Sequence, residues 1–118
     1  MKRLPEMPLE QVFNVLEREV QEIDRVSEWA EACNYSSSKN FSRKFRNRYG
    51  VRPITIIKKY KVGIAIKLLR EAKLSNYEIA LEIGKRDEQA LYHFIKQQTG
   101  NSPEFYKKKI REKNKRNK

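Results

Sequence analysis

Residues 30–53 read AEACNYSSSKNFSRKFRNRYGVRP, and this stretch decides the fold. Asn34 tolerates the left-handed conformation that ends a helix and turns the chain. The three serines that follow are good helix caps, and Phe41 and Phe45 stand four residues apart on one helical face. Gly50 then ends the pattern. The stretch therefore predicts a short helix, a tight turn and a second helix of about three turns.

The same layout returns 50 residues later in the chain. In this second copy Ser75 and Glu78 form a capping-box pattern, Gly84 ends the short helix, and Asp87 can cap the longer one. Identical pairs at this offset are Glu28/Glu78, Ala30/Ala80, Gly50/Gly100 and Pro53/Pro103. The apolar pairs are Trp29/Ile79, Cys33/Ile83, Phe41/Leu91 and Phe45/Ile95. Because caps, stops and core positions align without a gap, we infer that one helical unit occurs twice.

Three more helices are expected outside the repeated units, and the last of them begins at Ser102 and Pro103. Apolar residues recur at helical spacing up to Ile23, which predicts a support helix over about residues 8–23. A longer periodic stretch begins at Pro53 and predicts a linker helix that ends near Ala72. The expected fold is therefore all-α, with two helix-turn-helix subdomains joined by a long linker helix. The expected division is 1–52 for the support helix and first unit, 53–74 for the linker, 75–110 for the second unit and final helix, and 111–118 for a basic tail.

Aromatic side chains are assigned to the core because they fall on the inward helical phase, and not to base-stacking platforms. They are Trp29, Phe41, Phe45 and Phe105. Cys33 is the one cysteine, so it has no internal disulfide partner. Its apolar neighbours predict a buried thiol, which fits a cytoplasmic protein better than a redox sensor.

Charge is distributed unevenly along the 118 residues, whose net charge is +12. Residues 1–33 carry 4 basic and 8 acidic side chains, whereas residues 34–53 carry 6 basic and none acidic. The first unit should therefore attract polyanions before any specific contact forms. Eight more basic side chains lie within residues 107–118, where nonspecific DNA attraction and a merely solubilising role both fit. Nucleic acid is the first partner to expect.

The predicted DNA-facing residues lie on the longer helix of each unit, away from its apolar face. In the first unit they are Lys39, Asn40, Ser42, Arg43 and Arg46. In the second unit they are Gln89, His93 and Lys96. Residues 76–103 carry 3 basic and 4 acidic groups, and Glu88 would either accept from cytosine or repel phosphate. We therefore expect the first unit to dominate base discrimination.

Residues 30–53 and 79–106 resemble the DNA-binding module of the AraC/XylS transcription regulators, and the likeness extends over roughly residues 9–110. The linker matches the family pattern at Lys61, Ala65, Leu68 and Leu69, although the family usually has arginine in the place of Lys61. The second unit departs from the pattern at Lys85, where an aromatic residue is usual, and at Leu91 and Ile95, where phenylalanines are usual. The resemblance implies a bacterial regulator with two recognition helices in successive major grooves.

Linker length independently allows one chain to reach both grooves. A helix from Pro53 to Ala72 would span about 30 Å, near the roughly 34 Å between successive major-groove faces. We therefore expect a monomer on double-stranded DNA, with RNA polymerase as a second candidate partner.

Other protein classes have less support. The chain has one histidine, His93, no glycine-rich phosphate loop and no nucleophile–base pair, so we expect no enzyme, no metal and no cofactor. It has no run of 18 apolar residues, so we expect no membrane span. A nonspecific RNA-binding or nucleoid-type basic protein remains an alternative. The basic charge supports it as well as it supports sequence-specific DNA binding, but the paired helix-turn-helix units do not support it. A basic helix on an anionic membrane would need an exposed continuous apolar face.

Overall fold

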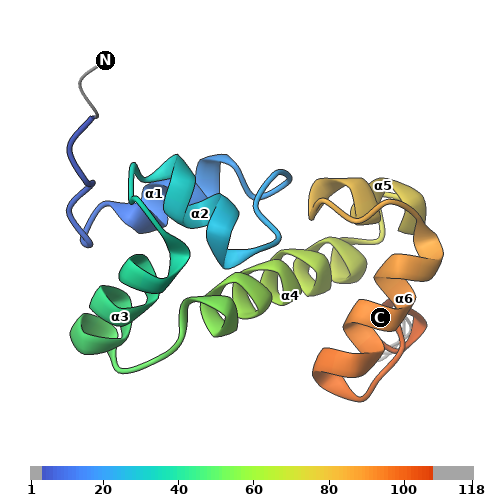
Figure 1. The fold of residues 1–118 in the computed structure, drawn as a ribbon. Helices are drawn as coiled ribbons and strands as arrows, with labels where there is room; N and C mark the ends of the chain where they lie inside the picture. Colours follow the sequence, from blue (N-terminus) through green and yellow to red (C-terminus); the bar gives the residue numbers. More distant parts are fainter. Residues whose placement is uncertain (1–3, 108–118) are drawn as a thin grey trace. The chain divides into compact units, whose positions relative to one another are not determined.

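The computed structural model describes residues 4–107, and every regular element in that range is a helix (Figure 1). The expected all-α fold is therefore confirmed. The helices are α1 (Val12–Arg18), α2 (Val26–Ala32), α3 (Ser38–Tyr49), α4 (Pro53–Glu71), α5 (Asn76–Glu82) and α6 (Glu88–Thr99), and residues 103–107 are also helical. The chain divides into two compact units within α4, between Lys59 and Tyr60. The basic tail predicted for residues 111–118 lies outside the described range.

The repeat is confirmed in the helix bounds themselves. Helices α2 and α5 begin and end at positions 50 residues apart, and so do α3 and α6. The turns repeat as well: Asn34 and Gly84 have φ angles of 68° and 76°, and Gly50 and Gly100 have 75° and 82°. Residues with a Cβ rarely adopt this left-handed region, and asparagine and glycine adopt it most readily. These turn residues therefore explain why the helices of the two units end at equivalent positions.

Side-chain caps begin the longer helices, as predicted. The Ser37 Oγ accepts a hydrogen bond from the Asn40 N–H at 3.1 Å, and the Asp87 Oδ1 accepts one from the Ala90 N–H at 2.9 Å. At the start of α5 the Ser75 Oγ accepts from the Glu78 N–H, and the Glu78 carboxylate accepts from the Ser75 N–H, both at 3.1 Å. These bonds satisfy amides that a helix start leaves without an intrahelical partner.

The core of the first unit is aromatic. Trp29 of α2 lies with its ring centroid 5.3 Å from those of both Phe41 and Phe45 of α3. Phe13 of α1 lies 6.0 Å from Trp29, and the Trp29 Nε1 donates a hydrogen bond to the Val12 carbonyl at 2.9 Å. Edge-on ring contacts of this kind stabilise aromatic pairs beyond the burial of their area. The support helix is thus attached directly to the helix-turn-helix pair.

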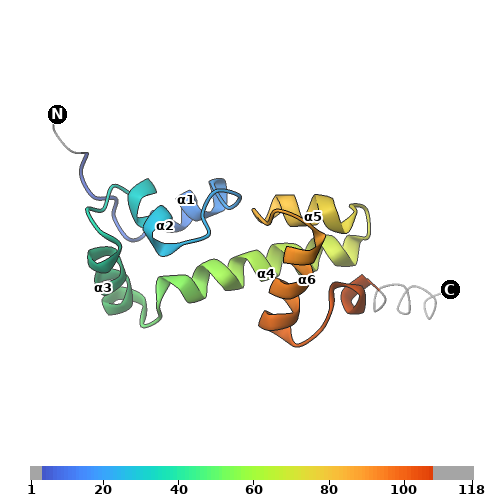
Figure 2. The same ribbon diagram turned by 45° about the vertical axis from the view of Figure 1, so that its right-hand side comes forward.

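The core of the second unit is mainly aliphatic, and it is built where α5 and α6 meet the carboxyl-terminal part of α4 (Figure 2). Its buried members are Ala65, Leu69, Ile79, Ala80, Ile83, Leu91, Ile95 and Tyr106. Leu91 and Ile95 replace the two phenylalanines of the first unit and are fully buried, so the same helix pair is held by smaller side chains.

The support helix is shorter than predicted, covering residues 12–18 instead of 8–23. The main chain before it bonds to the rest of the unit: the Met7 N–H donates to the Cys33 carbonyl at 3.0 Å, and the Leu9 carbonyl accepts from the Tyr49 hydroxyl at 2.8 Å. Residues 19–22 form turns, and Ile23 is buried from outside the helix. Local turns therefore flank the helix on both sides, at residues 9–11 and 19–22.

One smaller expectation also needs correction. Phe105 was expected in the core but is 43% exposed, because the helical stretch that carries it buries Pro103 and Tyr106 instead. Helix α4 ends at Glu71, next to the predicted end at Ala72, which has a φ of 55°. No helix within the described range is both long enough and apolar enough to cross a membrane.

Candidate nucleic-acid interface

Helix α3 presents a basic outer face opposite its aromatic one. Lys39, Arg43 and Arg46 are exposed, whereas Asn40 and Ser42 are half-buried. Phe41 and Phe45, on the inner face, are fully buried. All five predicted residues of the first unit therefore lie at the surface of the helix. The three basic side chains are more exposed to solvent than the two neutral ones.

Two shallow hollows lie along this face. One is lined by Ser37, Lys39, Asn40 and Arg43, and the other by Lys39, Ser42, Arg43, Arg46, Asn47 and Gly50. Lys39 and Arg43 border both, so they stand at the centre of the surface. Asn47 was missed in the sequence because its amide is neutral, although it is exposed four residues after Arg43. Within these hollows the groups contributed by lysine and arginine are hydrogen-bond donors suited to phosphate and to guanine.

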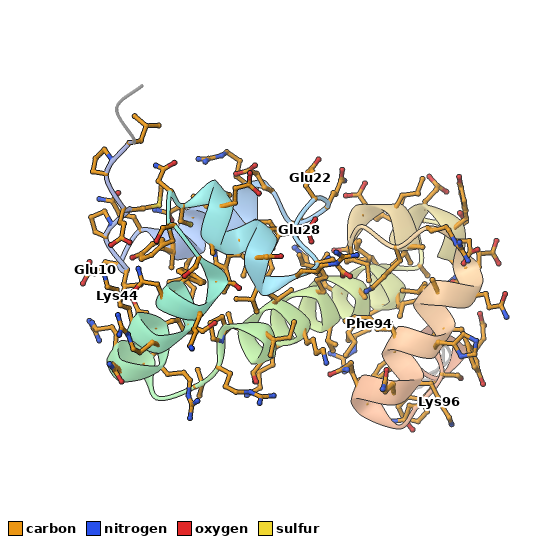
Figure 3. All side chains as sticks on the ribbon, in the orientation of Figure 1. Glu10, Glu22, Glu28, Lys44, Phe94 and Lys96 are labelled. Atoms are coloured by element: carbon orange, nitrogen blue, oxygen red, sulfur yellow. The ribbon has the colours of Figure 1, made fainter. Side chains whose placement is uncertain are left out.

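Acidic residues from the amino-terminal segment reach this basic helix, which the sequence did not predict. The Glu6 carboxylate accepts hydrogen bonds from the Asn40 Nδ2 at 2.9 Å and from the Lys44 Nζ at 2.7 Å. Glu10 lies 3.8 Å from the Arg48 Nε. Figure 3 shows Lys44 of α3 beside the segment that carries Glu10. Residues 34–53 contain no acid in the sequence, but in the folded unit they are contacted by carboxylates from residues more than 30 positions away.

The outer face of α6 has the same geometry and a different charge. Gln89, His93 and Lys96 are exposed, and Lys96 is seen toward the end of the helix in Figure 3. A hollow on this face is lined by Asn76, Glu88, Gln89, Tyr92, His93, Pro103 and Glu104. Two carboxylates at its border make it a poorer phosphate site than the hollows on α3.

Tyr92 is a candidate contact residue that the sequence reasoning missed. It is 45% exposed on α6, and its ring centroid lies 5.7 Å from that of His93. Its position corresponds to Ser42 of α3 after the 50-residue offset. Its sequence position gives a signal, because position 92 falls outside the Leu91–Ile95 inner face. The residue type alone does not indicate a DNA contact, because tyrosine is intermediate between buried and exposed residues in proteins.

Cys33 is buried, as predicted, and takes no part in this face. Burial raises the pKa of its thiol to about 11, with a further contribution from the Glu19 carboxylate. A thiol in that state is a poor nucleophile at neutral pH. No group of three or more metal-ligating side chains occurs among residues 4–107.

Comparison with known proteins agrees with this arrangement. Residues 29–109 match the family described as Helix-turn-helix domain, which covers both repeated units. The chain belongs to the AraC/XylS-type helix-turn-helix family. As a member of that family, it is a sequence-specific DNA-binding protein that regulates transcription. No curated protein matches the chain.

Solved structures of similar domains share the two-unit fold. The DNA-binding domain of AdpA, a global transcriptional factor crystallised with a target DNA, is 28% identical with a TM-score of 0.76, covering 91% of this chain and 96% of that one. The C-terminal domain of the response regulator yesN from Fusobacterium nucleatum is 24% identical with a TM-score of 0.73, covering 83% and 95%. The C-terminal domain of AraT from Geobacillus stearothermophilus is 21% identical with a TM-score of 0.75, covering 86% and 84%. The last two show the fold alone.

The departures of this AraC/XylS-type chain from the family pattern lie away from the outer faces of α3 and α6. Lys61 on α4 is only 1% exposed. Lys85 is half-buried, and its Nζ lies 4.4 Å from the centroid of the Phe94 ring. A lysine in that place keeps an aromatic contact through a cation–π interaction while its stem covers apolar surface. The substitution is therefore compatible with an intact second unit.

Proposed function

We propose that the protein binds duplex DNA as a monomer, with α3 and α6 as recognition helices in two successive major grooves. The observation that carries this proposal is the repeat: two helix pairs with bounds 50 residues apart, each with a longer helix that buries one face and exposes polar groups on the other. A two-fold symmetric dimer presents two such helices with two chains. Here one chain contains both.

The length of α4 supports two-groove binding. The helix has 19 residues without a break, and at a rise of about 1.5 Å per residue it spans about 28 Å. Successive major-groove faces of B-DNA are about 34 Å apart, which is close to this length.

Within this proposal the eight predicted residues make the DNA contacts: Lys39, Asn40, Ser42, Arg43 and Arg46 in one groove, and Gln89, His93 and Lys96 in the other. Arg43 is the strongest candidate for base reading, because arginine pairs both acceptors of guanine and this side chain borders both hollows. The acids beside α6 favour a smaller contribution from the second unit.

Stoichiometry tests the proposal. A duplex selected from random sequence by the full chain should lack palindromic symmetry and should bind one chain, as measured by titration and analytical ultracentrifugation. A requirement for two chains on each site would contradict monomeric binding while leaving the family assignment intact.

A nonspecific RNA-binding or nucleoid-type role is the second candidate, and the net charge of +12 favours it. Footprinting on the selected duplex in the presence of excess RNA separates the two. Protection that persists supports sequence-specific DNA binding, and protection that RNA abolishes supports the alternative.

Our proposal places the protein in the bacterial cytoplasm, beside RNA polymerase as a second partner, and assigns it no catalytic activity. Regulation of transcription requires both the DNA and the polymerase. The buried thiol of Cys33 suits a reducing compartment, although it does not require one.

A further inference from the structure

The segment before α1 is attached to the first unit through its main chain. The Met7 N–H donates to the Cys33 carbonyl at 3.0 Å, and the Met7 carbonyl accepts from the Tyr35 hydroxyl at 2.8 Å. Two residues later, the Leu9 carbonyl accepts from the Tyr49 hydroxyl at 2.8 Å. Both tyrosines also contact the aromatic core, so the segment is held against rigid groups. Glu6 directly precedes these anchors.

Glu6 begins a chain of hydrogen bonds that ends at Arg43. Its carboxylate accepts from the Asn40 Nδ2 at 2.9 Å, and the Asn40 Oδ1 accepts from the Arg43 Nη2 at 2.9 Å. A carboxylate only accepts, so it bonds to the amine end of the Asn40 amide. The amide oxygen is then turned toward Arg43, which is three residues farther along α3 and therefore its neighbour on the helix surface.

We propose that Glu6 is a positioning residue for base discrimination: it orients Asn40, which in turn holds the guanidinium of Arg43 ready for a base. The inference rests on the proposed function, in which Arg43 reads a base. Arginine has five donors, so the bond to Asn40 leaves most of them for DNA. A free arginine loses rotamer freedom when it binds a base, and a side chain already held loses less.

An acid beside a DNA-binding face also repels the DNA backbone. This electrostatic role and the positioning role predict different results when the acid is removed. A carboxylate repels phosphate whatever the base sequence, so removing it should strengthen binding to all duplexes alike. Removing a positioning residue should instead weaken discrimination between the preferred base and the others. A purely electrostatic Glu6 therefore changes affinity alone, and a positioning Glu6 changes the ratio of affinities.

Glu10 supplies the matched control. It lies on the same segment and is likewise next to a cation of α3, with 3.8 Å between its Oε1 and the Arg48 Nε. The Asn40 Nδ2 donates its side-chain hydrogen bond to the Glu6 carboxylate and not to that of Glu10. Glu6→Ala and Glu10→Ala thus each remove one charge, and each releases one basic side chain, Lys44 or Arg48. Only the first removes the acceptor that orients Asn40.

The experiment measures binding of the full chain to the selected duplex, to its single-base variants in the half-site under α3, and to an unrelated duplex, by fluorescence anisotropy at several salt concentrations. Both variants should bind the unrelated duplex roughly twofold more tightly, with a steeper salt dependence. Glu6→Ala should in addition lose on the order of fivefold discrimination at the base position that Arg43→Ala relaxes. Glu10→Ala should keep that discrimination.

The double variant Glu6→Ala/Arg43→Ala should discriminate no worse than Arg43→Ala, because both act on one contact. If Glu6→Ala changes affinity for every duplex by one factor while Arg43→Ala relaxes a base position, the positioning role is wrong and the proposed function stands. If Arg43→Ala itself weakens every duplex equally, base reading by Arg43 fails, and the positioning role fails with it. Thermal midpoints of the variants show whether each remains folded.

Discussion

Gly100 and Gly63 should respond to the same substitution with opposite signs. Both lie in the second unit, and a Cβ built on either meets no atom within 4 Å outside its own local backbone, so alanine makes no clash with the surrounding structure at either position. The two differ in backbone conformation. Gly100 ends α6 with a φ of 82°, whereas Gly63 lies inside α4. The comparison therefore isolates the cost of the left-handed region.

The magnitudes follow from the two conformations. Alanine in the left-handed region costs about 1–2 kcal/mol, partly offset by the reduced entropy of the unfolded chain, so Gly100→Ala should lower the free energy of unfolding by about 1 kcal/mol. In a helix interior alanine is better than glycine by about 0.5–1 kcal/mol, so Gly63→Ala should raise it. Since 1 kcal/mol shifts the midpoint of a small domain by about 4–8 °C, the two variants should differ by roughly 10 °C.

Thermal unfolding followed by circular dichroism, and urea titration at 25 °C, would measure both shifts. Gly100→Asn is the control, because asparagine tolerates positive φ and this chain already uses it at Asn34, where φ is 68°. It should cost less than Gly100→Ala. Equal stability of Gly100→Ala and the parent would refute the reasoning, and so would destabilisation by Gly63→Ala.

Three more predictions concern DNA binding, the turn of the second unit and the buried thiol. Arg43→Ala should relax preference at one or two base positions, worth about 1–3 kcal/mol of discrimination, whereas Lys58→Ala or Lys59→Ala should weaken all duplexes similarly, in binding to a panel of single-base variants at fixed salt. A uniform loss with Arg43→Ala would indicate a phosphate contact instead. Gly84→Val should lower both the thermal midpoint and DNA affinity, because φ is 76° at this turn; a variant with the parent's values would contradict the turn assignment. The Cys33 thiol has a folded pKa of about 11, above the usual 9.0, so its contribution to stability is present below pH 9 and is lost as pH rises toward 11. Cys33→Ala should therefore make unfolding by urea less sensitive to pH between 9 and 11, and an unchanged slope would show that the thiol does not titrate there.

Much of the fold could be predicted because its signals are local. Ser37, Ser75 and Asp87 cap helices through amides three residues away, and Asn34 and Gly50 end helices through their own backbone preferences. Such effects act within a few residues, so they can be seen in the sequence. The 50-residue repeat then placed every core pair of the two units, because identical spacing produces identical inward phases.

Packing decided what local signals could not. Phe105 and Tyr106 are adjacent, and only contact with the core of the second unit selects Tyr106 for burial and leaves Phe105 43% exposed. The main chain at Met7 and Leu9 bonds to Cys33 and Tyr49, and α1 begins only at Val12. Both partners lie far along the chain, so no local pattern predicts these bonds.

The candidate interface likewise has features set by the local sequence and features set by tertiary contacts. The sequence by itself determined that α3 carries a basic outer face, since charge and helical phase are both properties of the local stretch. Only the tertiary structure decided that Glu6 bonds to Asn40 and Lys44, at separations of 34 and 38 residues. No periodicity connects residues so far apart. They meet because Met7 and Leu9 are held by hydrogen bonds to Cys33, Tyr35 and Tyr49, which places the preceding carboxylate beside α3.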